Sequence, residues 1–357
     1  MMRILQAGVA AALFALPATS IVAEEAPLFA AEDPVEVVIT LPLQAIYREA
    51  SEEEREQMEG QLSYRDATGE SVQLSLKVRT RGVFRRENCS RPPLRLNFKK
   101  SEVKDTLFDG QDKLKLVNPC DANERSEQEL ALEYLAYKVY EEISDFSFRT
   151  RLLRLRLEDS NGKLDPWTTT AFIIEDEGEM LDRVGGAPLK ASQARRSQMD
   201  LPAVSRVELF QYLIANTDFS MYVAAPGRDC CHNTKLANLG DEESPRYVPV
   251  PYDFDSSGLV NARYARPPDF VPIDRVRQRY FMGYCRDEQF LDDAVAYFRE
   301  RREAIRAVFS SDLLTDKTRK STLKYIDRFF DILDSPKKVK RELADRCRGE
   351  RLTLKPE

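Results

Sequence analysis

Two short segments in the second half of the chain carry carboxylate and amide side chains of the types that hold metal ions. Residues 248–258, VPVPYDFDSSG, place Asp253 and Asp255 directly after an apolar run and before a turn of small residues. Upstream, Asp218 closes an amphipathic segment, and Asn233 lies between the two acidic positions in the sequence. Hard oxygen ligands of this kind suit Mg²⁺, so the pattern predicts a metal-holding strand end at Asp253 and Asp255.

Each acidic motif also has simpler explanations. Asp218 can cap the end of a helix, and Asp253 and Asp255 can initiate a turn, both of which are common positions for aspartate. Asp253-Phe254-Asp255 is also formally a DxD motif, which would hold the diphosphate of a nucleotide sugar in a glycosyltransferase. The first half of the chain lacks the alternating βαβ pattern expected of that class.

The composition restricts the classes of function open to the chain. Its 357 residues include 54 Lys and Arg against 60 Asp and Glu, a net charge of −6 at pH 7, so bulk charge argues against a nucleic-acid partner. His232 is the single histidine, and no nucleophile-elbow motif accompanies it. Gly185-Gly186 belongs to neither a GxGxxG nor a GxxxxGK[ST] pattern, so no Rossmann or P-loop site is predicted.

The N-terminus has the pattern of a secretory signal peptide. Arg3 precedes an apolar stretch over residues 4–16, and small residues lead to Ala23 before an acidic pair. We expect cleavage near Ala23, with an uncleaved anchor as the alternative. Beyond this stretch the sequence has no apolar segment long enough for a membrane span. The mature chain is therefore predicted to be exported to the periplasm or the cell exterior.

All six cysteines follow this leader, and an even number in an oxidising compartment favours disulfides. We expect Cys89 to pair with Cys120 and the other four to pair among themselves. Adjacent Cys230 and Cys231 leave that second connectivity open, because a bond between neighbours is strained. A zinc site on Cys230, Cys231 and His232 would need a second ligand pair at ordinary spacing, which the sequence lacks.

Residues 78–100, VRTRGVFRRENCSRPPLRLNFKK, form the strongly basic stretch of the chain. Alternation over residues 94–98 places Arg95 and Asn97 on the face opposite the apolar side chains, and a later strand carries Lys113 and Lys115 on one face. Arginine side chains around a glycine-containing turn suit a polyphosphate ligand. The alternative is a solvated strand face with its counter-acids, as most charge runs are.

Hydrophobic periodicity divides the chain into a β-rich first half, with one long helix, and a helical second half. Strands are expected over residues 35–43, 61–65, 71–81, 94–98, within 107–120, 151–157 and 168–174. Helices are expected over residues 46–58, 126–143, 180–183, 204–215, 288–309, 315–333 and 336–347. The predicted organisation is a signal peptide (1–23), a leader (24–33), a β-rich N-lobe (34–176), a helical C-lobe (177–350) and a tail (351–357).

Four segments together resemble the spore-coat CotH proteins and their relatives, a family of secreted atypical kinases. They are RTRG…RPPLRLNF (79–98), LKLVNPCDANER (114–125), AFIIEDEGEMLDR (171–183) and LIANTDFS…HN…VPYDFD (213–255). They span most of the mature chain up to about Gly258. The resemblance implies an α+β, bilobal, protein-kinase-like fold with a β-rich N-terminal lobe and a mainly helical C-terminal lobe.

The resemblance also implies a role for each acidic residue. Asp218 would orient or accept the proton of an attacking hydroxyl. Asp253 would hold Mg²⁺ or Mn²⁺ against the phosphates of ATP, with Asn233 completing the metal shell and Asp255 as a second ligand. Glu175 would lie at the hinge near the adenine.

The phosphate-neutralising cation would be Arg95 or Lys115. The implied activity is transfer of the γ-phosphate of ATP to a hydroxyl of a protein substrate that the sequence does not name. Two alternatives remain open. Nucleotide binding without transfer would make the chain a pseudokinase, and a fold of this kind can also serve a non-enzymatic envelope protein that binds a ligand or partner.

Overall fold

The computed structural model describes residues 26–48, 56–82, 84–224, 227 and 229–352. The predicted signal peptide (1–23) and most of the tail (353–357) lie outside the described residues. So does most of the helix that the sequence predicts over residues 46–58.

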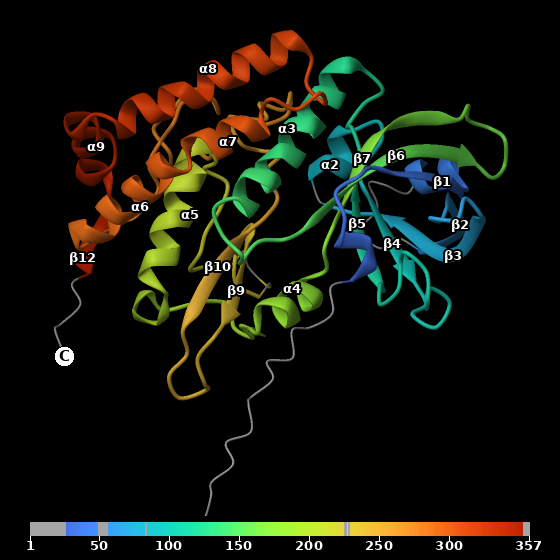
Figure 1. The fold of residues 1–357 in the computed structure, drawn as a ribbon, viewed down its shortest axis with the longest axis horizontal. Coiled ribbons are helices and arrows are strands. Elements are labelled where there is room, and N and C mark those ends of the chain that lie inside the picture. Colours follow the sequence, from blue (N-terminus) through green and yellow to red (C-terminus); the bar gives the residue numbers. More distant parts are fainter. Residues whose placement is uncertain (1–25, 49–55, 83, 225–226, 228, 353–357) are drawn as a thin grey trace, which may run out of the picture.

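The first half of the chain forms a closed seven-stranded β-barrel, on the right of Figure 1. Its strand order is β1-β2-β3-β4-β5-β7-β6, and parallel pairing of β1 with β6 closes the sheet, with Val35 opposite Leu153. All other neighbours in the barrel are antiparallel. The strands are β1 (Val35–Leu41), β2 (Met58–Arg65), β3 (Ser71–Thr80), β4 (Leu94–Phe98), β5 (Lys113–Val117), β6 (Thr150–Asp159) and β7 (Trp167–Ile174).

Alternating side chains fill the barrel. Ile39, Leu62, Leu96 and Leu155 are among the inward residues that are fully buried in its core. Their neighbours along each strand point outward and are polar or charged in β3, β4 and β6. Burial of each large aliphatic side chain contributes roughly 1.5–3 kcal/mol, so closure of the sheet around one apolar interior stabilises the barrel.

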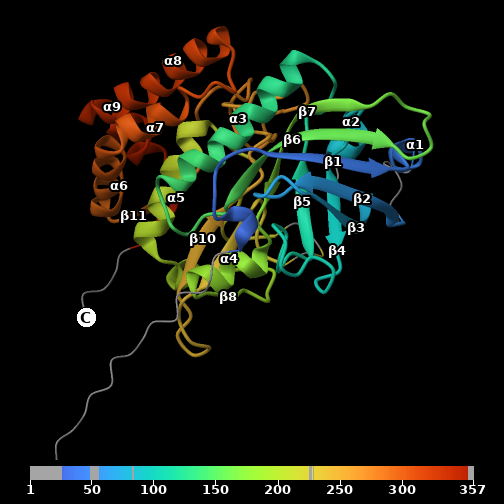
Figure 2. The same cartoon turned by 45° about the vertical axis from the view of Figure 1, so that its right-hand side comes forward.

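The second half of the chain packs helices around a larger core. Figure 2 shows α3 and α5 crossing the middle of the molecule, with α6 to α9 beyond them on the side away from the barrel. The helices of the first half are α1 (Leu43–Arg48), α2 (Phe84–Asn88) and α3 (Glu124–Glu141). Those of the second half are α4 (Glu177–Val184), α5 (Leu201–Ile214), α6 (Glu288–Glu300), α7 (Arg302–Val308), α8 (Asp316–Leu333) and α9 (Pro336–Glu342). Short 3-10 turns lie at Pro27–Phe29, Arg196–Gln198 and Ala344–Arg346.

Two small sheets complete the second half. A three-stranded sheet has the order β10-β9-β8, and β11 pairs with β12 in parallel. In Figure 1, β9 and β10 lie between α5 and the barrel. The strands are β8 (Ala187–Pro188), β9 (Thr234–Asn238), β10 (Tyr247–Pro251), β11 (Tyr284–Arg286) and β12 (Arg348–Leu352).

The expected bilobal kinase-like fold is wrong. The first half is a closed barrel, where the N-lobe of a kinase was expected. The second half contains two small sheets as well as its helices, where a mainly helical C-lobe was expected. The seven strands predicted for the first half are all present. The period-2 pattern shows which face of a strand is buried, but it does not show that β1 pairs with β6 and closes the sheet.

Three disulfides join the six cysteines: Cys89–Cys120, Cys230–Cys231 and Cys285–Cys347. The predicted pairing of Cys89 with Cys120 is confirmed, and the other four cysteines do pair among themselves. Across the described part of the chain, the helices include none with the length and apolarity that a membrane crossing requires.

Candidate functional site

A cleft of about 690 Å³ lies where the barrel meets the β9–β10 hairpin. It brings together four of the residues singled out in the sequence: Asp218, Asn233, Asp253 and Asp255. Its other charged, polar and aromatic lining includes Arg81, Phe84, Arg85, Asp229, His232, Lys235, Tyr252, Ser256 and Tyr264. Acidic and basic side chains from segments far apart in the sequence thus share one cavity.

The loop after α5 positions Asp218. The helix ends at Ala215, which has a left-handed backbone with φ 51°. The buried side chain of Asn216 then accepts a hydrogen bond from the Asp218 N–H at 2.9 Å through its Oδ1. Asn216 therefore shapes the turn, and the carboxylate of Asp218 projects into the cleft with 37% of its side chain exposed.

Two neighbours from the start of β9 hold the Asp218 carboxylate. His232 Nε2 lies 2.7 Å from Asp218 Oδ1. Asn233 Nδ2 donates to Asp218 Oδ2 at 3.1 Å and to the Asp218 carbonyl at 2.7 Å. Because the amide nitrogen of Asn233 is used in this way, its Oδ1 is the atom that can serve a cation.

The turn after β10 presents the second pair of carboxylates. Asp253 has a left-handed backbone with φ 63°, and its N–H donates to the hydroxyl of Tyr137 on α3 at 2.9 Å. Asp255 accepts a hydrogen bond from the Tyr264 hydroxyl at 2.7 Å. Burial and the nearby charge of Asp255 raise the pKa of Asp253 to about 6, against the lowering effect of nearby cations.

Three cations lie near these carboxylates: Arg81 and Arg85 line the cleft, and Lys115 of β5 lies outside its lining but interacts with the charge of Asp253. Burial, with Arg81 nearby, lowers the pKa of Lys115 to about 8, and its Nζ lies 4.7 Å from the ring centre of Tyr252. Arg81 has a buried Nε without a hydrogen-bond partner among the described residues. Arg85 donates to the Asn118 carbonyl at 2.7 Å and lies 3.4 Å from Glu133.

Glu133 is a buried acid behind the cleft. Burial raises its pKa to about 8, although the guanidinium of Arg85 opposes that shift. One of its carboxylate oxygens has no hydrogen-bond partner in the described structure. The pair of Glu133 and Arg85 is therefore buried next to the cleft, in surroundings where an unpaired charge would be costly.

The two remaining residues from the sequence lie elsewhere. Arg95 is on β4, opposite Lys115 of β5 in the strand register, and it is outside the residues that line the cleft. Glu175 is buried, and its carboxylate binds Arg183 through both oxygens at 2.9 and 2.7 Å. Of the residues predicted to bind ATP, Lys115 has the closest electrostatic coupling to Asp253.

Sequence reasoning missed His232, Arg81 and Arg85. The adjacency of His232 and Asn233 was a usable signal, since both side chains reach Asp218. Arg81 and Arg85 lie within the basic stretch, but nothing in its composition separates the cations that face the cleft from those that face solvent. That distinction depends on where β3 ends and α2 begins.

The acidic residues suit a hard divalent cation. No group of three or more His, Cys, Asp or Glu side chains in the described residues is arranged to hold a metal ion. An amide oxygen is also a common ligand of such cations, and Asn233, which carries one, lines the same cleft as Asp253 and Asp255. Burial and the charge of Asp255 raise the pKa of Asp253, and a bound cation would relieve the repulsion between the two carboxylates.

A scan of the chain against family models and a search of curated proteins both return no match. The resemblance to the CotH proteins therefore stays a prediction from the four sequence segments.

Proposed function

We propose that the protein is a phosphotransferase. It would bind a nucleoside triphosphate, such as ATP, together with a divalent cation in the cleft, and transfer the terminal phosphoryl group to a hydroxyl of a protein substrate. The observation that supports this is the convergence of two sets of groups in one cavity: Asp218, Asn233 and Asp253 with the cations of the barrel. Phosphoryl transfer depends mainly on positioning and on neutralising charge, which these groups can provide.

The cations would bind the phosphates of the donor. Arg81 lines the cleft, and Lys115 lies near enough to interact with the charge of Asp253. Lys235 is less suited to this role, because it forms an ion pair with Glu177 at 2.7 Å. The unpartnered Nε of Arg81 and the ammonium of Lys115 would each gain a charge-assisted hydrogen bond. A divalent cation on Asp253, Asp255 and Asn233 would supply further charge neutralisation at the same phosphates.

Asp218 would act on the acceptor hydroxyl. In the transfer, a bond forms between the acceptor oxygen and the terminal phosphorus, and the bond from that phosphorus to the bridging oxygen of the donor breaks. The proton of the hydroxyl passes to the Asp218 carboxylate, which Asn233 orients and which His232 contacts at 2.7 Å. The leaving diphosphate keeps the electron pair of the broken bond.

Binding without transfer is the second candidate. The carboxylate of Glu175, expected near the adenine, is engaged by Arg183 and by the backbone N–H of Arg149 at 3.0 Å. The side chain is therefore not available to a base. A protein that only binds a phosphate-bearing ligand would need no base-recognition site of that kind.

The direct test is transfer from γ-labelled ATP with Mg²⁺ or Mn²⁺ to a protein acceptor, for wild type and Asp218→Asn. We expect Asp218→Asn to reduce the rate by about a hundredfold or more, with unfolding unchanged. Asp312→Asn, an exposed substitution far from the cleft, is the matched control and should keep full activity. Stabilisation by ATP without any transfer would favour binding alone. Stabilisation by a nucleotide sugar, but not by ATP, would favour a glycosyltransferase.

We also propose that the chain is exported. The three disulfides are compatible with an oxidising compartment, in agreement with the predicted signal peptide. N-terminal sequencing of the protein recovered from its host should find a chain that begins near residue 24. An intact N-terminus on cytoplasmic protein would contradict export.

A further inference from the structure

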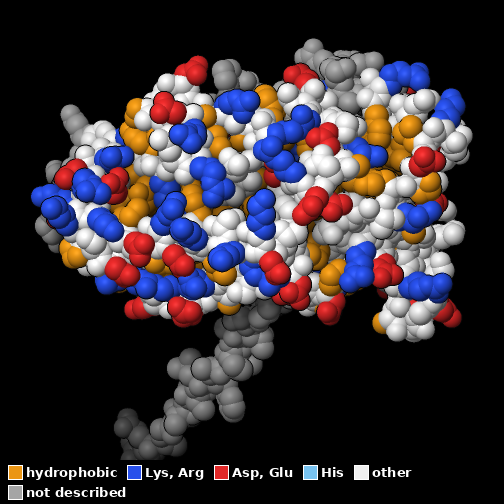
Figure 3. All heavy atoms as spheres, turned by 90° about the horizontal axis from the view of Figure 1, so that it is seen from above, with side chains coloured by type: hydrophobic (Ala, Val, Ile, Leu, Met, Phe, Trp, Pro, Cys, Tyr) orange, Lys and Arg blue, Asp and Glu red, His pale blue; other side chains and the backbone are white. Residues whose placement is uncertain are grey.

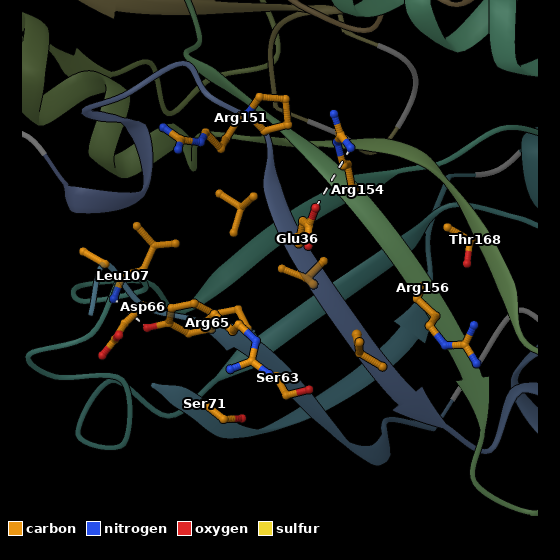
Figure 4. Close-up of a pocket in the computed structure, with 16 residues that line it drawn as sticks. Glu36, Ser63, Arg65, Asp66, Ser71, Leu107, Arg151, Arg154, Arg156 and Thr168 are labelled. Atoms are coloured by element: carbon orange, nitrogen blue, oxygen red, sulfur yellow. Dashed lines mark hydrogen bonds and ion pairs between the residues drawn. The ribbon is translucent and has the colours of Figure 1, made fainter. Parts of the chain in front are cut away.

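A second cavity lies on the outside of the barrel. It is a groove of about 820 Å³ over β1, β2 and β6, and it shares no lining residue with the cleft of Asp253. Figure 4 shows Arg154 and Arg156 on β6 and Arg65 on β2, on either side of β1. Arg151 lies near the start of β6, at one end of the groove.

Arg151 is the least expected member of this cluster. Only 6% of the residue is exposed, and its Nε and Nη1 have no hydrogen-bond partner among the described residues. Two buried donors without partners are costly, and burial lowers the pKa of Arg151, although the nearby charges of Asp33 and Glu32 oppose that shift. A ligand oxyanion at this end of the groove would satisfy the two donors.

Two arginines of the groove have partners at the surface. Arg156 Nε donates to Glu158 Oε1 at 2.7 Å, and Arg65 Nη1 donates to the Gly69 carbonyl at 2.9 Å. Both members of the ion pair are more than one-third exposed, so a ligand can compete with it.

The two acidic side chains that line the groove interact only weakly with its arginines. Asp66 accepts hydrogen bonds within its own turn, from Thr68 N at 2.9 Å, from Thr68 Oγ1 at 2.7 Å and from Glu70 N at 3.0 Å. Glu36 lies 4.0 Å from Arg154, and both side chains are more than two-thirds exposed. Such a surface pair contributes little and yields readily to a ligand.

The spacing of the charges favours an extended ligand. Arg154 and Arg156 are two residues apart on one strand and both are exposed, which separates their origins by roughly 7 Å. Arg65 lies across β1 from them, roughly 10 Å away for two strand spacings. Hydroxyls of Ser63, Ser71 and Thr168 lie between and beside these charges.

We infer that this groove binds an anionic oligosaccharide, with acidic groups on the arginines and sugar hydroxyls on the serines and threonine. A peptide is less favoured, because an extended peptide usually binds by adding a strand to a sheet edge. The barrel is closed and offers no such edge here. The groove presents side chains only, which suits a ligand that carries its own charges and hydroxyls.

The test is binding of the full chain to a labelled uronate oligosaccharide and to a sulfated one, with a neutral glucan and poly-glutamate as comparison ligands. The double variant Arg154→Ala/Arg156→Ala removes two exposed side chains, so folding should be retained. We expect saturable binding of at least one acidic sugar, weakened about tenfold or more in this variant. Lys99→Ala/Lys113→Ala removes the same charge from exposed positions outside the groove and should change affinity less than about twofold.

The control is needed because Lys and Arg are spread widely over the face of the molecule that Figure 3 draws. Equal losses in the two double variants would mean non-specific attraction and would overturn the assignment. So would no binding of either acidic sugar, or poly-glutamate binding as tightly as they do. Asp253→Asn should bind the sugar like wild type, because Asp253 lies outside the groove. The binding result can therefore be interpreted even if the phosphotransferase proposal fails.

Discussion

Asp253 and Lys115 set the pH range of the cleft. A cation binds the ionised form of Asp253, whose pKa is about 6, and a phosphate is attracted by the protonated form of Lys115, whose pKa is about 8. Ligand affinity should therefore rise as pH increases through 6 and fall as pH increases through 8. Calorimetric titration of ATP with Mg²⁺ across this pH range measures both the rise and the decline in affinity.

The variant Lys115→Arg distinguishes the rise in affinity near pH 6 from the decline above pH 8. Arginine keeps its charge throughout this range, so the variant should lose the decline above pH 8 and keep the rise near pH 6. A decline at high pH that persists in Lys115→Arg would assign it to another group, such as Glu133, whose pKa is also about 8.

The same pKa shift of Asp253 affects stability. Its folded-state pKa is raised, so the folded protein holds this proton more tightly than the unfolded chain does. The contribution to stability is present below the ordinary pKa and is lost as pH rises from about 4 to about 6. At neutral pH the charged carboxylate of Asp253 therefore lowers the stability of the unliganded protein.

At the residue scale, the sequence predicted the acidic half of the cleft better than the basic half. Asp218, Asn233, Asp253 and Asp255 follow short motifs, and each motif places its side chain at the end of an element. Arg81 and Arg85 come from residues 78–100, where many cations are available, and Lys115 comes from β5. Which of them faces the cleft depends on the packing of the barrel against the second half, and that packing leaves no local pattern.

At the scale of elements, α5 leads into the loop that carries Asp218, and a buried ion pair anchors this helix. Arg286 on β11 donates to Glu208 Oε1 at 2.7 Å and to Ser205 Oγ at 2.6 Å, and both members of the ion pair are buried. Glu208→Ala would leave the guanidinium buried without its partner. We expect a loss of roughly 3–5 kcal/mol in the free energy of unfolding, measured by urea denaturation.

Glu102→Ala is the matched control for that measurement. Glu102 forms an ion pair with Lys99 at the surface, so its loss should change stability by less than about 1 kcal/mol. If the two variants unfold at the same urea concentration, the pair of Glu208 and Arg286 does not anchor α5.

Elements were predicted well where the hydrophobic pattern repeats without interruption. The strand over residues 94–98 and the helix over 315–333 lie within one residue of the observed β4 and α8. The lobe boundary predicted between residues 176 and 177 falls at the start of α4, where Asp176 caps the helix by accepting from Gly178 N. Acidic residues beside glycine suit either role, and the local sequence does not separate them.

At the scale of the whole molecule, closure and cross-links determine the fold. The bond Cys285–Cys347 ties β11 to the end of the chain across 62 residues. The loop entropy for a separation of this size corresponds to roughly 4 kcal/mol, so Cys285→Ser/Cys347→Ser should lose about that much stability. Urea unfolding under non-reducing conditions measures it, and equal stability of variant and wild type would show that this bond contributes nothing.

The overall architecture was the part that sequence reasoning got wrong. The strands of the first half were expected, but a kinase-like lobe was inferred from their order. Val35 pairs with Leu153 and Leu41 with Asp159, so β1 and the distant β6 close the barrel. Long-range pairing of this kind is set by the three-dimensional fit of the whole sheet, and short sequence segments carry no record of it.

The most direct test of the phosphotransferase account is thermal unfolding with ATP and Mg²⁺, together and singly, in wild type and Asp253→Asn. Ligand at about a hundred times its dissociation constant stabilises a protein by roughly 2.7 kcal/mol, which corresponds to a rise of roughly 5 °C for a chain of this size. We predict that rise for wild type only when ATP and Mg²⁺ are both present, and none for Asp253→Asn. No rise in wild type at millimolar nucleotide, or an equal rise in Asp253→Asn, would contradict the assignment of this cleft.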